Sequence, residues 1–335
     1  MTFRHMLVRV CPDRVTHGGN IGLQFKQGMT MTKTIDTLIE DVEAVLKDGV
    51  VEVPDEIARR FAENMYELAK SRLKTYERKP TLRMSNIGSP CVRKLHQQIN
   101  RPEEAEELSA DTKLKFLYGD VIEEMMLFLA ELAGHSVEGR QSVQEISGIK
   151  GHRDAVIDGT LVDVKSTSSF SYKKFKDGNL ASDDPFGYRV QLQSYLHASQ
   201  DDDVVVDKSR AAFWAVDKTL GHQCLDFHDK QDYKFEAVYE IKKEIVNDAE
   251  NRPDRAFELE EDGYKKKEKD GSSTFVANGN MKLGMFCSYC DMKHACYDGK
   301  VRTFLSTRAP LHLVEVVKEP RMIEVDRYGN KIEKE

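Results

Sequence analysis

Two aspartates and a lysine stand close together near the middle of the chain. Asp154 is followed after a short interval by the run Asp163-Val164-Lys165. Carboxylate oxygens are the ligands that Mg²⁺ and Mn²⁺ prefer, and such an ion polarises a phosphodiester and lowers the pKa of bound water. A neighbouring ammonium can orient the attacking water or offset developing negative charge. These residue types therefore predict metal-dependent phosphodiester hydrolysis.

A β-hairpin would bring the three side chains together. Residues 149–157 and 160–165 have the composition of two short strands, with Asp158-Gly159 between them. This dipeptide favours a type I′ turn, which requires positive φ at both central residues. Because side chains alternate along a strand, Asp163 and Lys165 share one face. A hairpin whose charged face is merely solvated is the alternative, since Asp and Lys are common near turns.

The spacing of these residues resembles the signature of the PD-(D/E)XK nucleases. Gly151-His152-Arg153, directly before Asp154, is similar to the RecB-like branch of that superfamily, and Gln191 and Tyr195 match its downstream Gln-x-x-x-Tyr helix. The resemblance implies an α/β fold with a restriction-endonuclease-like core, in which a mixed sheet is flanked by helices. It also implies that Lys165 positions water, while Gln191 and Tyr195 support this lysine and the DNA end.

A third carboxylate is expected from an upstream helix. Residues 113–134 carry apolar side chains at helical spacing. The segment 119–124 resembles the Gly-x-x-x-His/Glu element of RecB-like and lambda-type exonucleases, and on that register Glu123 is a metal ligand. Helical periodicity instead puts Glu124 at the margin of the apolar stripe and Glu123 opposite it. We predict Glu123 as the ligand, following the family register. Glu124 is the alternative ligand, and the remaining possibility is that both glutamates are ordinary surface residues.

The ligand set for Mg²⁺ or Mn²⁺ that follows from this resemblance has four members. They are the carboxylates of Glu123, Asp154 and Asp163 and the carbonyl oxygen of Val164.

Three of the six cysteines lie within ten residues, as Cys287, Cys290 and Cys296. The spacing Cys-x2-Cys-x5-Cys is typical of a metal site and requires a fourth ligand. Cys91 is the candidate, because one cysteine before the nuclease motifs and three after them resemble the [4Fe–4S] arrangement of CRISPR-associated RecB-like exonucleases, of AddB and of flap-processing helicase–nucleases. Zinc is the alternative occupant, with His294 able to replace Cys91.

Composition sets limits on the function. The formal net charge of −7 over 335 residues argues against a generally basic nucleic-acid binder, so a nuclease of this composition needs a local basic groove and a divalent metal. No apolar run approaches membrane-spanning length, and we expect a cytoplasmic protein of a prokaryotic or phage-infected cell with no membrane partner. The absence of a Gly-x4-Gly-Lys-Ser/Thr motif excludes a P-loop helicase.

Four segments are predicted along the chain. They are a flexible leader (1–30), a basic helical arm (31–80) that either lines a DNA channel or is simply solvated, a nuclease domain closed by the Fe–S cluster (81–305) and a C-terminal tail (306–335). Within this tail, residues 311–317 are expected to form a strand and the charged remainder to be frayed. Within the domain, residues 170–185 are expected to form a loop, and the charge-dense residues 258–273 a mobile connector.

The resemblance implies a DNA exonuclease of phage or prokaryotic recombination or DNA processing. DNA is the expected partner, together with a recombination or single-strand annealing protein. A structure-specific endonuclease and a catalytically inactive DNA-binding scaffold with a zinc site are the alternatives. Cleavage polarity, oligomeric state and the choice among phage recombination, host DNA degradation and spacer acquisition stay open.

Overall fold

The computed structural model describes residues 33–74, 80–231, 235–306 and 309–333. The predicted leader (1–30) lies outside the described residues. Lys33–Glu335 form a single compact unit.

A mixed sheet forms the centre of this unit. Its strand order is β1-β4-β5-β6-β7, and only β5 and β6 are parallel neighbours. The five strands are β1 (Val137–Glu138), β4 (Ala155–Ile157), β5 (Thr160–Thr167), β6 (Arg210–Asp217) and β7 (Gln223–Asp229). The predicted α/β class with a mixed sheet is therefore confirmed.

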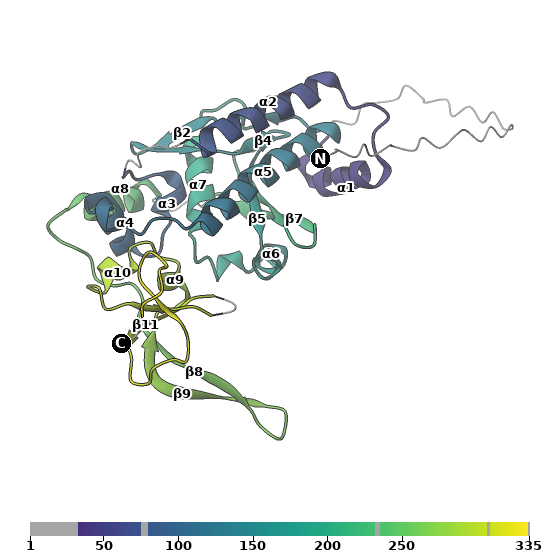
Figure 1. Cartoon of the computed structure of the whole chain (residues 1–335). Helices are drawn as coiled ribbons and strands as arrows, with labels where there is room; N and C mark the ends of the chain where they lie inside the picture. The colour runs from purple at the N-terminus through teal and green to yellow at the C-terminus, as the bar shows by residue number, and fades with distance from the viewer. Residues whose placement is uncertain (1–32, 75–79, 232–234, 307–308, 334–335) are drawn as a thin grey trace, which may run out of the picture. The chain divides into compact units, whose positions relative to one another are not determined.

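Alternating side chains of β5 and β6 supply a core on each face of the sheet. Val162, Val164 and Trp214 point to the face covered by α1 (Leu38–Asp48) and α5 (Ala110–Leu132). Leu161 and Phe213 point to the other face. The helices of that face are α3 (Met84–Ile87), α6 (Ser169–Lys176), α7 (Tyr188–Ala198) and α8 (Phe235–Asn247), and Figure 1 shows them around the central strands.

The predicted hairpin is present, with one correction. Asp158 and Gly159 have φ values of 48° and 79°, as a type I′ turn between β4 and β5 requires. The single strand expected over residues 149–157 is split, however. Its first part, β3 (Ile149–His152), pairs with β2 (Val143–Ile146) in a separate two-stranded sheet. The break falls at Arg153, whose buried guanidinium turns away to an ion pair with Asp202 at 2.7 Å.

The loop expected over residues 170–185 is wrong for its first half. Helix α6 begins after Ser168, whose hydroxyl accepts a hydrogen bond from the Ser171 amide at 3.3 Å. Tyr172 and Phe175 are three residues apart and bury one face of this helix against the sheet. A short 3-10 helix, η3 (Asn179–Ala181), follows.

A second sheet corrects two further expectations. Its strand order is β12-β10-β11-β9-β8. The strands are β8 (Glu260–Lys267), β9 (Ser273–Lys282), β10 (Arg302–Phe304), β11 (Leu311–Glu315) and β12 (Glu324–Val325). Residues 258–273 thus include β8 rather than a mobile connector. Strand β11 lies within the strand expected over residues 311–317, and β12 falls in the segment that was expected to be frayed. The charge density of β8 hid it, since this edge strand has no buried side chain.

The helical arm packs on a helix that covers one face of the central sheet. Helix α2 (Asp55–Arg72) contacts α5 through Phe61 and Phe128, whose ring centroids lie 4.6 Å apart. Its arginines pair with acids, Arg60 with Glu131 at 3.0 Å and Arg72 with Asp120 at 2.7 Å. This pairing favours a charged structural face over a DNA channel. Arg78 and Lys79 lie outside the described residues.

The remaining helices are short. They are η1 (Ile35–Thr37), α4 (Val92–Asn100), η2 (Pro102–Glu104), α9 (Met285–Ser288) and α10 (Lys293–Cys296). In the portion of the chain that is described, no helix is both long enough and apolar enough to cross a membrane.

Candidate functional site

Asp163 and Lys165 project from the same face of β5. The Asp163 side chain is buried, with the residue 2% exposed, and its Oδ1 contacts the Lys165 ammonium. Apart from that contact, neither carboxylate oxygen of Asp163 has a hydrogen-bond partner among the described residues. A buried carboxylate with unused oxygens is costly unless another cation approaches it.

Asp154 reaches the same place from the break after β3. Its Oδ2 accepts a hydrogen bond from the Val164 amide at 2.8 Å, which fixes the carboxylate against β5. Burial raises its pKa well above the usual range, and the negative charges of Asp163 and Glu123 raise it further. Two acids from different strands are therefore held together where ordinary solvation cannot stabilise their charge.

Glu123, rather than Glu124, is the helical carboxylate at this site. It accepts a hydrogen bond from Gln141 at 2.7 Å, and burial together with the charge of Asp163 raises its pKa to about 7. Glu124 is buried elsewhere, where it pairs with Arg140 at 3.1 Å. Helical periodicity identified Glu124 as inward-facing, but a salt bridge explains that burial.

The Gln-x-x-x-Tyr residues lie beside the acids. Tyr195 donates a hydrogen bond to the His152 carbonyl at 2.7 Å, and a Cβ atom on Gly151 would lie 2.9 Å from the tyrosine oxygen. Glycine at 151 thus permits this close packing. Burial and the Asp163 charge raise the pKa of Tyr195 to about 12, and the Gln191 side chain hydrogen-bonds to the same hydroxyl.

Tyr188 is a site residue that sequence reasoning missed. The Lys165 ammonium lies 4.9 Å from the Tyr188 ring centroid and 5.9 Å from that of Phe213. Burial opposes the charged form of Lys165, but the charges of Asp163 and Asp154 outweigh it and raise the lysine pKa. The available signal was the position of Tyr188 one helical turn before Gln191.

For the phosphodiester hydrolysis expected of these residues, replacing Tyr188 with Leu should reduce turnover by about tenfold, because a desolvated cation–π contact contributes about 1–2 kcal/mol. Tyr188→Phe keeps the ring face and should retain most activity. The measurement is kcat for both variants, with thermal melting to show that each is folded. Equal activity of the Leu and Phe variants would remove the role assigned to the ring.

The raised pKa of Glu123 predicts a pH dependence of stability in the metal-free protein. Its folded pKa of about 7 lies above the ordinary value of 4.5, so the folded state binds more protons than the unfolded state between those pH values. The free energy of unfolding should therefore fall as the pH rises through this window. Asp154 acts in the same direction.

Urea denaturation at a series of pH values in chelator tests this dependence. Glu123→Gln should flatten the curve, whereas Glu145→Gln, at an exposed ion pair with Lys150, should not. A curve for Glu123→Gln that coincides with the unmodified protein would contradict the assignment.

The structure also brings the four expected cysteines together. Cys91 caps α4, and its sulfur accepts a hydrogen bond from the Lys94 amide at 3.4 Å. Burial raises the pKa of Cys287, and the neighbouring thiols of Cys91 and Cys296 raise it further. Burial raises the pKa of Cys290 to about 12, and Cys91 again contributes. A cavity of about 90 Å³ is lined in part by Cys91, Cys287 and Cys290.

Arginines hold the two cysteine segments side by side. Arg93, from the Cys-x-Arg sequence, donates hydrogen bonds to the carbonyls of Pro253 at 2.8 Å and Cys296 at 3.5 Å. His294 instead faces Glu106, with Nε2 at 3.0 Å from the carboxylate. Cys91, and not His294, therefore lies with the other three thiols.

Within the residues that the structure describes, no three His, Cys, Asp or Glu side chains stand in a geometry that would hold a metal ion. The donor chemistry nevertheless fits. Asp163 offers two buried oxygens without hydrogen bonds next to two further acids, and four neighbouring thiols are a donor set for an iron–sulfur cluster or zinc.

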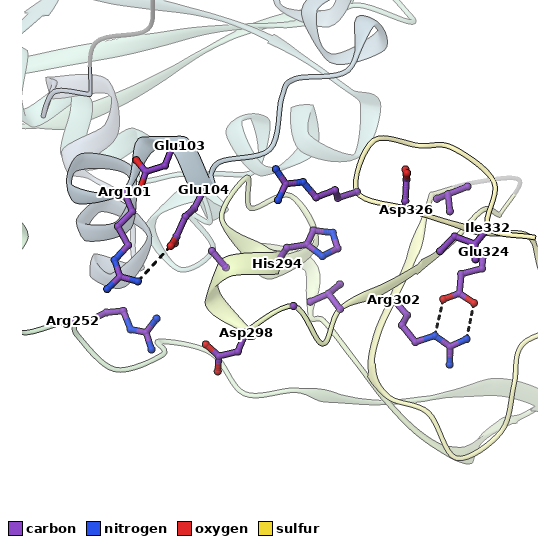
Figure 2. A pocket seen from close by; sticks show the side chains of 15 residues that line it. Arg101, Glu103, Glu104, Arg252, His294, Asp298, Arg302, Glu324, Asp326 and Ile332 are labelled. Carbon is purple, nitrogen blue, oxygen red and sulfur yellow. Dashed lines mark hydrogen bonds and ion pairs between the residues drawn. The ribbon is translucent and has the colours of Figure 1, made fainter.

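A cavity of about 610 Å³ lies elsewhere, between the segment around η2, helix α10 and the second sheet (Figure 2). Arginines and acids line it, and two of the arginines pair with acids: Arg101 with Glu104 at 3.5 Å and Arg302 with Glu324. None of the acids or thiols described above lines this cavity. Its size alone does not make it the reactive centre.

Comparison with known proteins leaves the family open. No protein-family model and no curated protein matches the chain. Among solved structures, the crystal structure of SSO0001 is similar at 15% identity, covering 59% of this chain and 88% of that chain with a TM-score of 0.34. A likeness of this strength supports no conclusion about fold family or function, which rest on the residues themselves.

Proposed function

We propose that the protein is a metal-dependent deoxyribonuclease of exonuclease type, built on a PD-(D/E)XK core. The observation that carries this proposal is the convergence of Glu123, Asp154, Asp163 and Lys165 on one buried face. They come from a helix, a strand break and a strand. A structural role would not require three mutually repelling carboxylates around a single lysine.

Three carboxylates and the Val164 carbonyl would hold one or two Mg²⁺ or Mn²⁺ ions. Such an ion, when bound, supplies polarisation of the phosphodiester and a lower pKa for its water. The three acids also favour the binding of a cation. Their mutual repulsion raises the pKa values of Glu123 and Asp154, and a bound positive charge would relieve that repulsion.

Lys165 is the proposed positioning group for the attacking water. Asp163 and Asp154 keep it protonated, and Tyr188 and Phe213 cover its ammonium with their ring faces. A charged, immobilised ammonium can orient water and offset negative charge that develops on phosphate oxygens. Tyr195, anchored on the His152 carbonyl, supports this arrangement from α7.

DNA as substrate follows from the motif resemblance and from the chemistry of the acids. The four thiols support a [4Fe–4S] cluster as a structural group in the same unit, with zinc as the other occupant. Roles in phage or prokaryotic DNA recombination, and a recombination or single-strand annealing protein as partner, belong to the same proposal.

A digestion assay tests it. Linear single-stranded and duplex DNA are incubated with Mg²⁺, Mn²⁺ or EDTA, and circular single-stranded DNA is the control for free ends. We expect metal-dependent loss of linear DNA, none in EDTA and intact circles. Cleavage of circles would indicate an endonuclease, and binding without cleavage under every condition would indicate an inactive scaffold.

A further inference from the structure

The far half of the β8–β9 hairpin is open to solvent on both faces. We call residues 264–275 the distal ribbon. Every residue in it except Glu268 is exposed. Figure 1 shows β8 and β9 as a long two-stranded ribbon. A two-stranded ribbon is only marginally stable alone. We therefore expect a partner to stabilise the part of this hairpin that extends beyond the second sheet.

Aromatic and basic side chains alternate on this distal ribbon. Lys265 is directly opposite Phe275, and Lys267 is opposite Ser273, so both lysines share a face with the phenyl ring. Phe275 is 47% exposed although its ring lies over Gly263, and Tyr264 on the other face is 60% exposed. Among the described residues, neither Lys265 nor Lys267 has an ion-pair partner, whereas Lys266 pairs with Glu268 at 3.5 Å.

We infer that the distal ribbon binds single-stranded DNA. Lys265 and Lys267 would contact phosphates, and Phe275 and Tyr264 would stack on bases, as in binding sites that combine basic and aromatic side chains. The inference rests on the proposed function for the identity of the polymer. It adds a second contact region, with local positive charge, to a chain whose net charge is −7.

Single-stranded DNA fits better than duplex because of the exposed rings. Unpaired bases offer a π-face to Phe275 and Tyr264, whereas bases in a duplex are already stacked on their neighbours. Lysines on an edge strand also discourage pairing with another sheet edge, but that role would not require two exposed aromatic side chains on the same ribbon.

Binding of labelled oligothymidylate, measured by fluorescence anisotropy over a range of salt concentrations, tests the inference. The full chain carrying Asp163→Asn is used so that cleavage does not interfere. Adding Lys265→Gln and Lys267→Gln should weaken binding about tenfold and reduce the salt slope by about 1.4, since each phosphate contact on a single strand contributes about 0.7. Tyr264→Ala should weaken binding by about fivefold through lost stacking.

The matched control makes the same charge change at exposed lysines elsewhere, Lys47→Gln with Lys318→Gln, and should leave affinity and slope unchanged. Unchanged binding in the ribbon variants, an equal loss in the control, or a loss seen only with duplex DNA would each overturn the inference. Binding that survives in Tyr264→Ala would overturn the stacking role.

If the digestion assay shows cleavage while the ribbon variants bind normally, the inference fails and the proposed function stands. If DNA binding depends on the ribbon but no cleavage occurs, the inference stands and the proposed function fails.

Discussion

Replacing Asp163 with Asn is expected to reduce metal-dependent DNA cleavage by about a thousandfold or more, because it removes the central carboxylate of the proposed metal site. The substitution keeps the side-chain shape and leaves Asp154 and Glu123 near Lys165. It also removes one of three repelling charges, so the metal-free variant should unfold at the same temperature as the unmodified protein or a higher one. DNA binding should remain largely intact.

Initial cleavage rates and thermal melting of the same preparations are the measurements. Lys165→Ala is a second variant at the site and should also abolish cleavage, although it leaves the acids without their ammonium and is expected to be less stable. Glu145→Gln changes an exposed acid and serves as the control. Full activity in folded Asp163→Asn or Lys165→Ala would remove the proposed mechanism.

Replacing Cys287 with Ser is expected to abolish binding of the proposed iron–sulfur cluster. Cys287 lies next to both Cys91 and Cys296, so its replacement removes the central thiol of the four. Anaerobically purified protein should be brown, and the variant colourless with iron and sulfide at background. The melting temperature should fall by about 10 °C or more, since metal binding by neighbouring thiolates is coupled to folding.

Cys224→Ser is the matched control for the cysteine variants. Cys224 lies in β7 next to Tyr172, away from the other thiols, and burial raises its pKa to about 11. This variant should keep colour, iron content and most of its stability. Undiminished iron in Cys287→Ser would contradict the cluster assignment, and a colourless unmodified protein with bound zinc would replace the cluster by a zinc site.

The local features of the site were predictable because short-range chemistry determines them. The turn at Asp158-Gly159 follows from positive φ, and α7 carries Gln191 and Tyr195 on one helix as expected. The alternation that puts Asp163 and Lys165 on one face is a property of any strand. In these cases the sequence pattern and the tertiary structure require the same conformation.

Features that depend on distant partners were not predictable from local pattern. The strand break at Arg153 depends on Asp202, which follows α7. Periodicity indicated that Glu124 faces inward, but not the reason, which is its salt bridge with Arg140. Strand β8 could not be recognised because its stabilisation comes from pairing with β9, while its own side chains stay exposed. Tyr188 acquires its role only because α7 packs over β5.

Direct measurement of Mn²⁺ binding tests most closely whether the buried acids form a divalent metal site. Isothermal titration calorimetry of the unmodified protein, Asp163→Asn and Glu145→Gln at the same pH gives affinity and stoichiometry. The account predicts one or two ions per chain in the unmodified protein and in Glu145→Gln, with binding to Asp163→Asn weakened at least about tenfold. Equal Mn²⁺ binding by all three proteins, or none by the unmodified protein, would contradict it.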